Sequence, residues 1–326
     1  SAMPSHLQQA ILQSLSQQPH AGTQLARCLG VSRTAVWKAI KQLVAQGVPV
    51  QHRVGEGYSL SFPYMPLDAE AIATLAFPDS VSPASVLVHN MLESSNGHLL
   101  EMARAGAAHG TIVVAEGQSG GRGRRGRSWS SPWGQNLYFS MLLRFDAPAS
   151  ALAPFTLVAG LVLAEVLAHL GATDHGIKWP NDILHEGRKL AGVLCELQGE
   201  FEGPCALVVG IGVNVHAETP NPAIDQPWTS LKAAFGLTLD RNLLAGLLAR
   251  ALLQAHQQFC EEGFAAFHAR WERWDLLRNQ PVKVLHPGRD EPGLALGVNE
   301  SGQLRVDFGG ATRIVHSGEV SIRLGT

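Results

Sequence analysis

A stretch of alternating arginine and glycine in the middle of the chain has the composition of an anion-binding loop. Residues 120–129 read Gly-Gly-Arg-Gly-Arg-Arg-Gly-Arg-Ser-Trp and contain no acidic side chain. Glycine lets a ligand approach the main chain closely, and arginine offers a permanent charge with a planar fork that pairs with phosphate or carboxylate. The stretch predicts a mobile loop that folds around a multiply charged anion; its charged members are Arg122, Arg124, Arg125 and Arg127.

The position of this loop helps to choose between its interpretations. Strand-like segments at 111–116 and 136–143 flank it, whereas arginine–glycine tails that bind RNA lie in disordered, apolar-poor segments. A solvated basic loop without a role is a further alternative. Loops held by a rigid sheet commonly carry the active site, so we favour a functional loop.

Two further segments place polar groups at the ends of apolar strands. Lys189 stands at the head of the apolar segment 188–194, and a buried lysine is costly unless an anionic group faces it. Pro180 ends a preceding strand and leaves Asn181 and Asp182 beyond it. An amide and a carboxylate there would suit a magnesium ion or its waters; an ordinary Asx turn is the alternative.

Small polar residues open a helix near the start of the central region. Ser94, Ser95 and Asn96 follow a strand-like segment at 86–91 and precede a helix at 98–105. These side chains either contact a ligand or simply cap the helix, and the local sequence by itself favours capping.

The strand predicted at 207–214 contains Gly210 and Gly212, which indicates that another group approaches it closely. A dinucleotide-binding motif needs a third glycine and a following helix. Both are missing here, so we reject that interpretation.

Charge is distributed unevenly along the 326 residues. The whole chain carries a formal net charge of -2, but residues 1–63 hold five basic and one acidic side chain, a net charge of +4, so the remainder carries -6. A basic head on a mildly acidic body predicts that the head alone meets nucleic acid.

Helical spacing of apolar residues in the head predicts two short helices joined by a turn at residues 30–32, before a hairpin made by 48–53 and 58–62. This order is typical of a winged helix-turn-helix, whose second helix enters the major groove. We expect that helix to bury Val36, Ile40, Leu43 and Val44. The residues expected to face DNA are Arg33, Thr34, Trp37, Lys38, Lys41 and, in the wing, Arg53. A small helical domain for protein contacts is the alternative.

The rest of the chain mixes adjacent strands with helices, which predicts an α+β multidomain protein. Residues 63–68 read as a linker, and Asp68 is placed to cap a following helix. We expect a DNA-binding domain over 1–63, a central catalytic domain over 66–275 and a C-terminal domain over 278–326. Short alternating strands in the last segment predict a small β-barrel.

Cysteine usage and hydropathy indicate a cytoplasmic protein with no membrane partner. The four cysteines form no C-x-x-C pair, so we expect them to be reduced. The most apolar run, 151–172, contains Pro154, Glu165 and His169, which predicts a buried helix rather than a membrane span. We recognise no secretory signal peptide.

Three segments in this order resemble the bifunctional biotin–protein ligase and biotin operon repressor family of bacteria. They are 121–129, the Lys-Trp-Pro-Asn-Asp of 178–182 and the Arg-Lys-Leu-Ala-Gly of 188–192. The resemblance spans essentially the whole chain. It implies a central mixed-sheet domain of the biotin/lipoate ligase type and an SH3-like C-terminal barrel.

The resemblance also implies the activity of a biotin–[acetyl-CoA-carboxylase] ligase. Biotin and Mg-ATP would give biotinyl-5′-AMP, which passes its biotinyl group to a lysine of the carboxylase's biotin carrier domain. The implied catalytic residues are Lys189, Arg122 and Arg124. The implied biotin contacts are Ser94, Ser95, Asn96, Gln118, Arg122, Gly123, Arg124, Lys189 and Gly192. The implied ATP contacts are Arg124, Arg125, Arg127, Trp129, Asn181, Asp182, Asn214 and Arg323, with Mg²⁺ near Asp182.

As a repressor, the protein would bind operator DNA as a homodimer promoted by biotinyl-5′-AMP, its corepressor. Two departures from the family pattern concern these roles. Ser128 stands where many members carry lysine or threonine, which bears on loop closure, and Glu56 places an acid in the wing, which bears on operator contact.

Two alternatives share parts of this pattern. A lipoate-type acyl ligase would use the same reaction type but would be expected to lack the arginine loop and the head. A catalytically weak, biotin-sensing transcription regulator would lack the loop arginines or Lys189, all of which are present.

Overall fold

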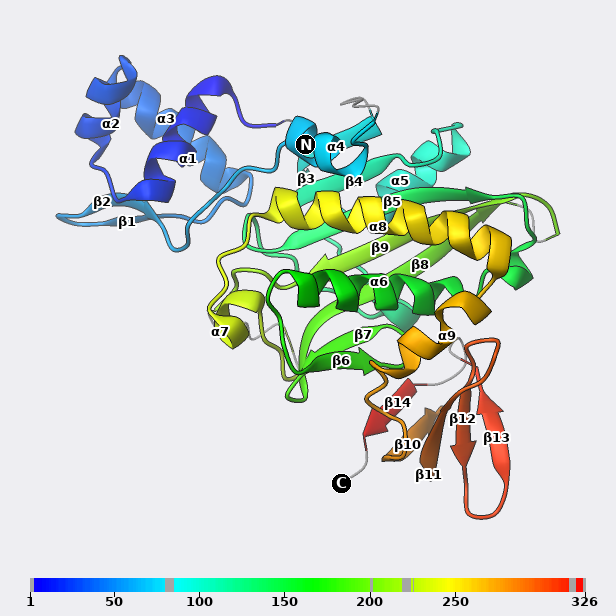
Figure 1. Cartoon of the computed structure of the whole chain (residues 1–326). Helices are drawn as coiled ribbons and strands as arrows, with labels where there is room; N and C mark the ends of the chain where they lie inside the picture. Colours follow the sequence, from blue (N-terminus) through cyan, green and yellow to red (C-terminus); the bar gives the residue numbers. More distant parts are fainter. Residues whose placement is uncertain are drawn as a thin grey trace.

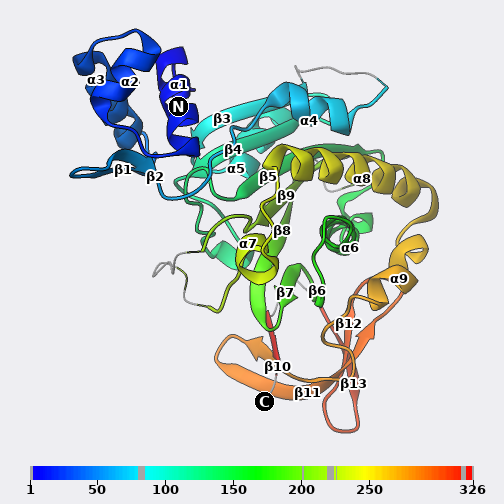
Figure 2. The ribbon, with the colours of Figure 1, turned by 60° about the vertical axis from the view of Figure 1, so that its left-hand side comes forward.

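The computed structural model describes residues 3–79, 85–199, 202–218, 224, 226–316 and 321–324. Three parts follow one another along the chain (Figure 1): a small helical head, a central domain built on a large sheet, and a C-terminal sheet. The head and the C-terminal sheet lie at opposite ends of the central domain in both views (Figures 1 and 2).

The head is the predicted winged helix-turn-helix. Its helices are α1 (His6–Gln17), α2 (Gly22–Leu29) and α3 (Arg33–Ala45), and its wing is the antiparallel hairpin of β1 (Val50–Arg53) and β2 (Gly57–Leu60). Gly30 ends α2 in the left-handed conformation, with φ of 67°, and the Ser32 hydroxyl caps α3 by accepting from the Ala35 N–H at 3.1 Å.

One core prediction for the head is wrong. Val44 is 50% exposed, because the buried stripe of α3 runs along Val36, Ile40 and Leu43 and Val44 lies one residue beyond it on the solvent side.

The central domain is built on a seven-stranded mixed sheet with the order β3-β4-β5-β9-β8-β7-β6. Only β3 and β4 run parallel; every other neighbouring pair is antiparallel. The strands are β3 (Val86–Leu92), β4 (Ile112–Gln118), β5 (Leu137–Phe145), β6 (His175–Lys178), β7 (Asp182–His185), β8 (Arg188–Gly199) and β9 (Cys205–Val213). The mixed sheet confirms the predicted α+β class.

Helices cover both faces of this sheet. On one face, α6 (Phe155–His169) and α8 (Arg241–Glu262) lie side by side (Figures 1 and 2); on the other, α5 (Ser95–Arg104) packs on β4, β5 and β9. Three shorter helices complete the domain: α4 (Ala69–Ala76), α7 (Leu231–Phe235) and α9 (Ala265–Glu272). Asp68 caps α4 as predicted, since its carboxylate accepts from the Glu70 and Ala71 N–H groups.

The apolar run at 151–172 contains α6, which packs against the sheet, α8 and α9 and therefore needs no wide polar face. Within the part of the chain that the structure describes, no helix is long and apolar enough to cross a membrane.

The C-terminal part forms a five-stranded antiparallel sheet. Its strands are β10 (Pro281–His286), β11 (Arg289–Val298), β12 (Leu304–Asp307), β13 (Thr312–Val315) and β14 (Ser321–Leu324), and their order is β13-β12-β11-β10-β14. The predicted short strands are confirmed. The two edge strands, β13 and β14, do not pair with each other over the described residues, so the sheet is open where we expected a barrel.

The segment predicted to be a linker is packed between the head and the central domain. Phe62, Tyr64 and Leu67 are each less than 10% exposed. The Tyr64 ring lies 4.5 Å from that of Trp133, a residue of the central domain, and Trp133 itself belongs to the apolar core of the head. The two domains therefore share one hydrophobic core at this point.

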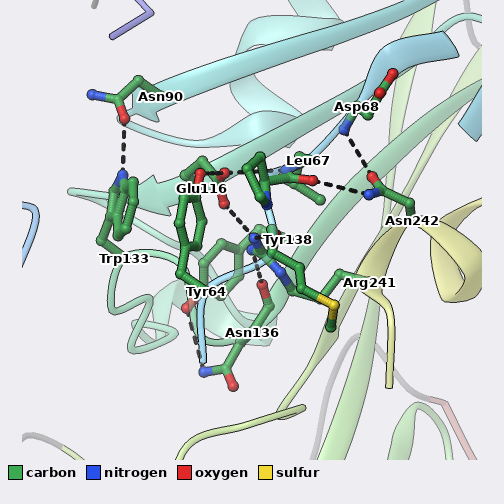
Figure 3. Close-up of polar contacts among 12 residues, drawn as sticks. Tyr64, Leu67, Asp68, Asn90, Glu116, Trp133, Asn136, Tyr138, Arg241 and Asn242 are labelled. Atoms are coloured by element: carbon green, nitrogen blue, oxygen red, sulfur yellow. Dashed lines mark hydrogen bonds and ion pairs between the residues drawn. The ribbon is translucent and has the colours of Figure 1, made fainter. Parts of the chain in front are cut away.

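A buried ion pair lies beneath this shared core (Figure 3). Arg241, at the start of α8, contacts Glu116 of β4 at 2.7 Å, and both side chains are at most 2% exposed. Glu116 accepts hydrogen bonds from the Tyr64 hydroxyl and the Leu67 N–H, and Arg241 donates to the Met65 carbonyl at 2.8 Å. Burial, followed by the Glu116 carboxylate, raises the pKa of Tyr64, so its hydroxyl keeps the proton that it donates.

Candidate active site

A cavity of about 520 Å³ lies where the central sheet meets the C-terminal strand β14. Its walls come from the arginine loop, the start of α5, the β6–β7 hairpin, the start of β8 and the glycines of β9. Most of the predicted site residues line it: Ser94, Ser95, Asn96, Gln118, Arg122, Gly123, Arg124, Arg127, Trp129, Asn181, Asp182, Lys189, Gly192 and Arg323. Arg125 and Asn214 are not among the lining residues.

The arginine loop is closed at its base by backbone hydrogen bonds. Gly123 N–H donates to Arg127 O at 2.7 Å, and Trp129 N–H donates to Gly121 O at 2.8 Å. Between them, residues 124–126 form a single 3₁₀ turn in which Arg125 has a φ of 58°. Arg125 is exposed in this turn and does not line the cavity.

Glycines of β9 form the floor because larger residues would collide with the groups above them. A Cβ atom at Gly210 would lie 2.3 Å from Asn96 Oδ1, and one at Gly212 would lie 2.7 Å from the Trp129 ring. The close approach predicted for this strand is confirmed, and the approaching groups are two of the predicted ligand contacts.

A hydrogen-bond network holds the polar residues at the start of α5. The Ser140 hydroxyl donates to Asn96 Oδ1 at 2.5 Å and lies 2.7 Å from the Ser95 hydroxyl. Ser95 N–H donates to Gln118 Oε1 at 2.8 Å. Ser94 caps the helix, as the alternative interpretation has it, and also lines the cavity.

Ser140 is fully buried and was not predicted. Its signal in the sequence is a small hydroxyl residue inside the otherwise apolar segment 137–143. A buried hydroxyl needs a hydrogen-bond partner, and Asn96 and Ser95 are those partners.

Lys189 has the anionic partner that its position requires. Its Nζ lies 3.1 Å from Asp182 Oδ1, with side chains 17% and 20% exposed, and also 4.9 Å from the centroid of the Trp129 ring. Asp182 is the first residue of β7, so it projects from a hairpin rather than from a free strand end.

Positive charge dominates the cavity. Among the described lining residues Asp182 is the single carboxylate, and it faces six cationic side chains: Arg122, Arg124, Arg127, Lys178, Lys189 and Arg323. Burial lowers the pKa of Arg124, and the neighbouring Arg125 and Arg127 lower it further, against the opposite effect of Asp182. Such a cavity is suited to a ligand with several negative charges.

Lys178 belongs to this cluster although we assigned it no role from the sequence. Burial lowers its pKa, and the charges of Lys189, Arg127 and Arg124 act in the same direction, opposed by Asp182. The only sign of Lys178 in the sequence is its place as the first residue of the Lys-Trp-Pro-Asn-Asp motif.

Two predicted ATP contacts, Asn181 and Asn214, form hydrogen bonds with the backbone that shapes the cavity. Asn181 Nδ2 donates to Val193 O at 2.7 Å, which fixes the turn before Asp182. Asn214 N–H donates to Leu190 O at 3.0 Å, and its Nδ2 lies 3.5 Å from Lys189 O. Asn214 thus supports the strand that carries Lys189 from behind the cavity.

A metal ion would find few protein ligands here. The described residues contain no group of three or more histidine, cysteine or acidic side chains arranged for a metal. Mg²⁺ keeps several waters and is commonly held by one or two carboxylates together with substrate phosphates. Asp182 fits that limited role.

The predicted DNA-binding side chains of α3 are all exposed on one surface of the head. Lys41 Nζ lies 4.8 Å from the centroid of the Trp37 ring, which is 52% exposed. In the wing, Arg53 lies 3.8 Å from Glu56, and both side chains are more than 60% exposed. Glu56 thus partly offsets the charge that Arg53 would offer to a phosphate.

The head and the central domain match different protein families. A model of the biotin/lipoate A/B protein ligase family matches residues 90–214, and a model of an HTH domain matches residues 7–59. The bifunctional ligase/repressor BirA of Escherichia coli K12 is 39% identical over 306 residues, or 93% of each chain. BirA of Bacillus subtilis is 30% identical over 329 residues, which cover 98% of this chain and all of its own.

A solved structure matches about three quarters of the chain. The biotin protein ligase of Aquifex aeolicus, in complex with biotin and ATP, is 30% identical with a TM-score of 0.65 and covers 74% of this chain and 99% of its own. Because identity to BirA extends over the head as well as the central domain, this chain belongs to the family of bifunctional biotin ligase/repressor proteins.

Proposed function

We propose that this protein is an ATP-dependent biotin–protein ligase that also represses transcription in response to biotin. The observation that carries the proposal is the single cavity in which the polar start of α5 faces a cluster of cations. Ser94, Ser95, Asn96 and Gln118 would hold biotin at one end. The loop arginines, Lys178, Lys189 and Arg323 would hold the triphosphate at the other.

The first step joins two anions and therefore needs compensating positive charge. A biotin carboxylate oxygen attacks the α-phosphorus of ATP, the new O–P bond forms, and the bond to pyrophosphate breaks. Negative charge grows on the α-phosphate oxygens and on the leaving group. Lys189, Arg122 and Arg124 line the cavity and would stabilise this charge, since preorganised charge of this kind accelerates such a reaction.

Orientation and the exclusion of water complete the catalysis. The cavity would hold both substrates side by side, which turns a bimolecular encounter into an oriented one. In the second step, the amine of a carrier-domain lysine attacks the biotinyl carbonyl carbon, the C–N bond forms, and AMP leaves. Closure of the arginine loop over the mixed anhydride would protect it from hydrolysis before the carrier arrives.

Mg²⁺ would neutralise phosphate charge when it is bound with ATP, and Asp182 would be its protein ligand. This role asks Asp182 to share its carboxylate between the metal and Lys189, 3.1 Å away. The Asp182 carboxylate would attract both partners, because the metal ion and the Lys189 ammonium group are both positively charged.

Repression would require two copies of the head on a symmetric operator, so we propose a homodimer promoted by biotinyl-5′-AMP. A free strand edge supports this. The described pairing of β8 with β7 stops at Gly192, and Val193 still bonds with Asn181, so residues 195–199 of β8 extend past these contacts. Unpaired strand edges are ready to pair with another chain, and this one lies beside the arginine loop through the Arg122–Glu196 contact.

We also propose that the C-terminal sheet curls in the manner of an SH3-like barrel. The ten-residue strand β11 pairs with both of its neighbours, and its register shifts between Ala295 and Gly297. A bulge of this kind bends a strand and helps to close a small sheet. We also propose a cytoplasmic location, which the free cysteines and the proposed carrier substrate support.

Pyrophosphate release with ATP and Mg²⁺ tests the ligase directly, with biotin, lipoate or no acid added, and then with a biotin carrier domain. We expect release with biotin alone, followed by a mass gain of one biotinyl group on the carrier. Release with lipoate but not with biotin would show that lipoate is the substrate. No release with either acid would indicate a biotin-sensing regulator without ligase activity.

A further inference from the structure

Glu196 contacts two of the residues that line the cavity, yet it has no role so far. It lies on β8, and its Oε1 accepts from Arg122 Nη2 at 2.9 Å and from Asn96 Nδ2 at 3.1 Å. One carboxylate oxygen thus joins the arginine loop to the start of α5.

The Asn96 side chain is fully oriented by its neighbours. Its Oδ1 accepts from the Ser140 hydroxyl, whereas its Nδ2 donates to Leu194 O at 3.1 Å and to Glu196. A flipped amide would turn its oxygen toward a carbonyl and a carboxylate, neither of which can donate, so both acceptors favour the observed orientation. Glu196, together with Leu194 O, thus helps to decide which atom of Asn96 remains for a ligand.

The ion pair between Glu196 and Arg122 differs from the hydrogen bond to Asn96, because a ligand can easily replace Glu196 as the partner of Arg122. The Arg122 side chain is 43% exposed and that of Glu196 is 25% exposed. Half-exposed ion pairs contribute little and are screened by water. A phosphate or acyl-adenylate that enters the cavity carries a stronger acceptor for the same guanidinium.

We propose that Glu196 is a positioning residue that holds Arg122 and Asn96 in place before substrates bind and then releases Arg122 to the anionic ligand. The inference rests on the proposed ligase function, because it takes an adenylate as the competing anion. It assigns to Glu196 two separable tasks: a charge-dependent hold on Arg122 and a hydrogen bond to the Asn96 amide.

Two substitutions separate these tasks. Glu196→Gln keeps an oxygen that accepts from Asn96 but removes the charge that holds Arg122, while Glu196→Ala removes both. In the ligand-free protein, we expect trypsin to cleave the loop at Arg125 and Arg127 about two- to fivefold faster in both variants, the range that a weak ion pair allows. Sodium chloride at about 1 M should raise the wild-type rate toward that of the variants.

Ligand affinity gives the second measurement, with a non-hydrolysable acylsulfamate analogue of biotinyl-5′-AMP as the probe. Glu196→Gln should bind it two- to fivefold more tightly than wild type, because the competing carboxylate is gone. Glu196→Ala should bind it more weakly than Glu196→Gln, because the Asn96 amide loses one of the two acceptors that orient it. Glu101→Gln, on the exposed face of α5, controls for the change of net charge.

An Arg122→Ala background completes the test, since the effect of Glu196→Gln on loop cleavage should vanish there. The inference is overturned if Glu196→Gln leaves cleavage and affinity at wild-type values, or if it weakens the analogue as much as Glu196→Ala does. Absence of biotin-dependent pyrophosphate release by wild type would instead contradict the ligase proposal; the cleavage measurements need no substrate and would still decide whether Glu196 holds the loop.

Discussion

Lys189 and Asp182 face each other across the β7–β8 hairpin, with Nζ 3.1 Å from Oδ1 and the Trp129 ring beside the ammonium group. Both side chains are about four-fifths buried. The lysine is thus held in the cavity by the one carboxylate among the described lining residues. An incoming phosphate would find its counter-charge already positioned, and rearrangement of Lys189 would not be needed.

Loss of the Lys189 charge should remove adenylate formation while the fold remains. For Lys189→Met we expect pyrophosphate release to fall about 10²- to 10³-fold, as when one preorganised electrostatic contact to a transition state is deleted. Lys232→Met is the matched control, because Lys232 pairs with Glu218 outside the cavity. Steady-state release and a thermal melt measure both proteins. Wild-type rates in Lys189→Met would remove the lysine from the reaction.

A methyl group on the floor of the cavity should disrupt the biotin end of the site. Gly210→Ala places a Cβ atom 2.3 Å from Asn96 Oδ1, so Asn96 must leave its hydrogen bonds with Ser140 and Leu194. We expect biotin affinity to fall at least tenfold by calorimetry. Gly160→Ala, in α6, meets its nearest atom at 3.9 Å and should bind biotin as wild type does.

The buried ion pair of Glu116 and Arg241, inside the central domain next to the head, should be costly to break. Arg241→Met leaves the Glu116 carboxylate charged and buried, and we expect the free energy of unfolding to fall by about 3–5 kcal/mol. Arg250→Met, at an exposed position of the same helix, should change it by less than about 0.5 kcal/mol. Urea denaturation compares the two. If the two variants had equal free energies of unfolding, water would replace the ion pair without cost.

DNA binding should depend on the lysines of α3 without affecting ligation. If Lys38 and Lys41 each contact a phosphate, alanine at either position lowers the slope of log affinity against log salt by about 0.9. Lys283→Ala, on the C-terminal sheet, should leave that slope unchanged. Operator binding over a series of salt concentrations, beside pyrophosphate release, tests the prediction. A simultaneous loss of ligation would indicate damage to the fold rather than to a DNA contact.

Acid should destabilise the protein through His175, which is 7% exposed. Its Nε2 lies 2.9 Å from Ala164 O, and burial, followed by the charge of His185, lowers its pKa below 6.5, against the opposite effects of Ala164 O, Thr173 O and Asp174. The unfolded chain therefore takes up the proton first as pH falls below about 6.5.

The resulting loss of unfolding free energy should approach about 1.4 kcal/mol per pH unit between the unfolded and folded pKa values of His175. Urea midpoints at pH 7.5 and pH 5.5 measure it. His175→Gln should lose less stability between these two conditions than wild type. An equal loss in both proteins would assign the acid sensitivity to other groups.

Local patterns predicted those parts of the molecule whose cause lies within a few residues. The turn at Gly30 and Ser32, the wing and the arginine loop each depend on short-range rules of φ angle, capping and charge. The anionic partner of Lys189 could be anticipated too, because burial of an ammonium group demands one, although the sequence did not name Asp182 as that partner.

Contacts between distant segments could not be anticipated in the same way. Asn96 meets Ser140 and Glu196, which are 44 and 100 residues away along the chain. Those meetings depend on strand order and register across the sheet, which no local pattern specifies. For the same reason residues 63–68 read as a linker, whereas three-dimensional packing buries Tyr64 and Leu67 against the central domain.

The joint of Tyr64, Glu116 and Arg241 also bears on how such a protein changes over evolutionary time. A head attached by a loose tether can be deleted without harm, because neither part depends on side chains of the other. Here, deletion of residues 3–67 would remove two donors to Glu116 and the carbonyl acceptor of Arg241. The Glu116 carboxylate and the Arg241 guanidinium would then lack hydrogen-bond partners that they have in the intact protein. Loss of the head without cost to the central domain would therefore have to spare residues 64–67 or be accompanied by changes in β4 and α8.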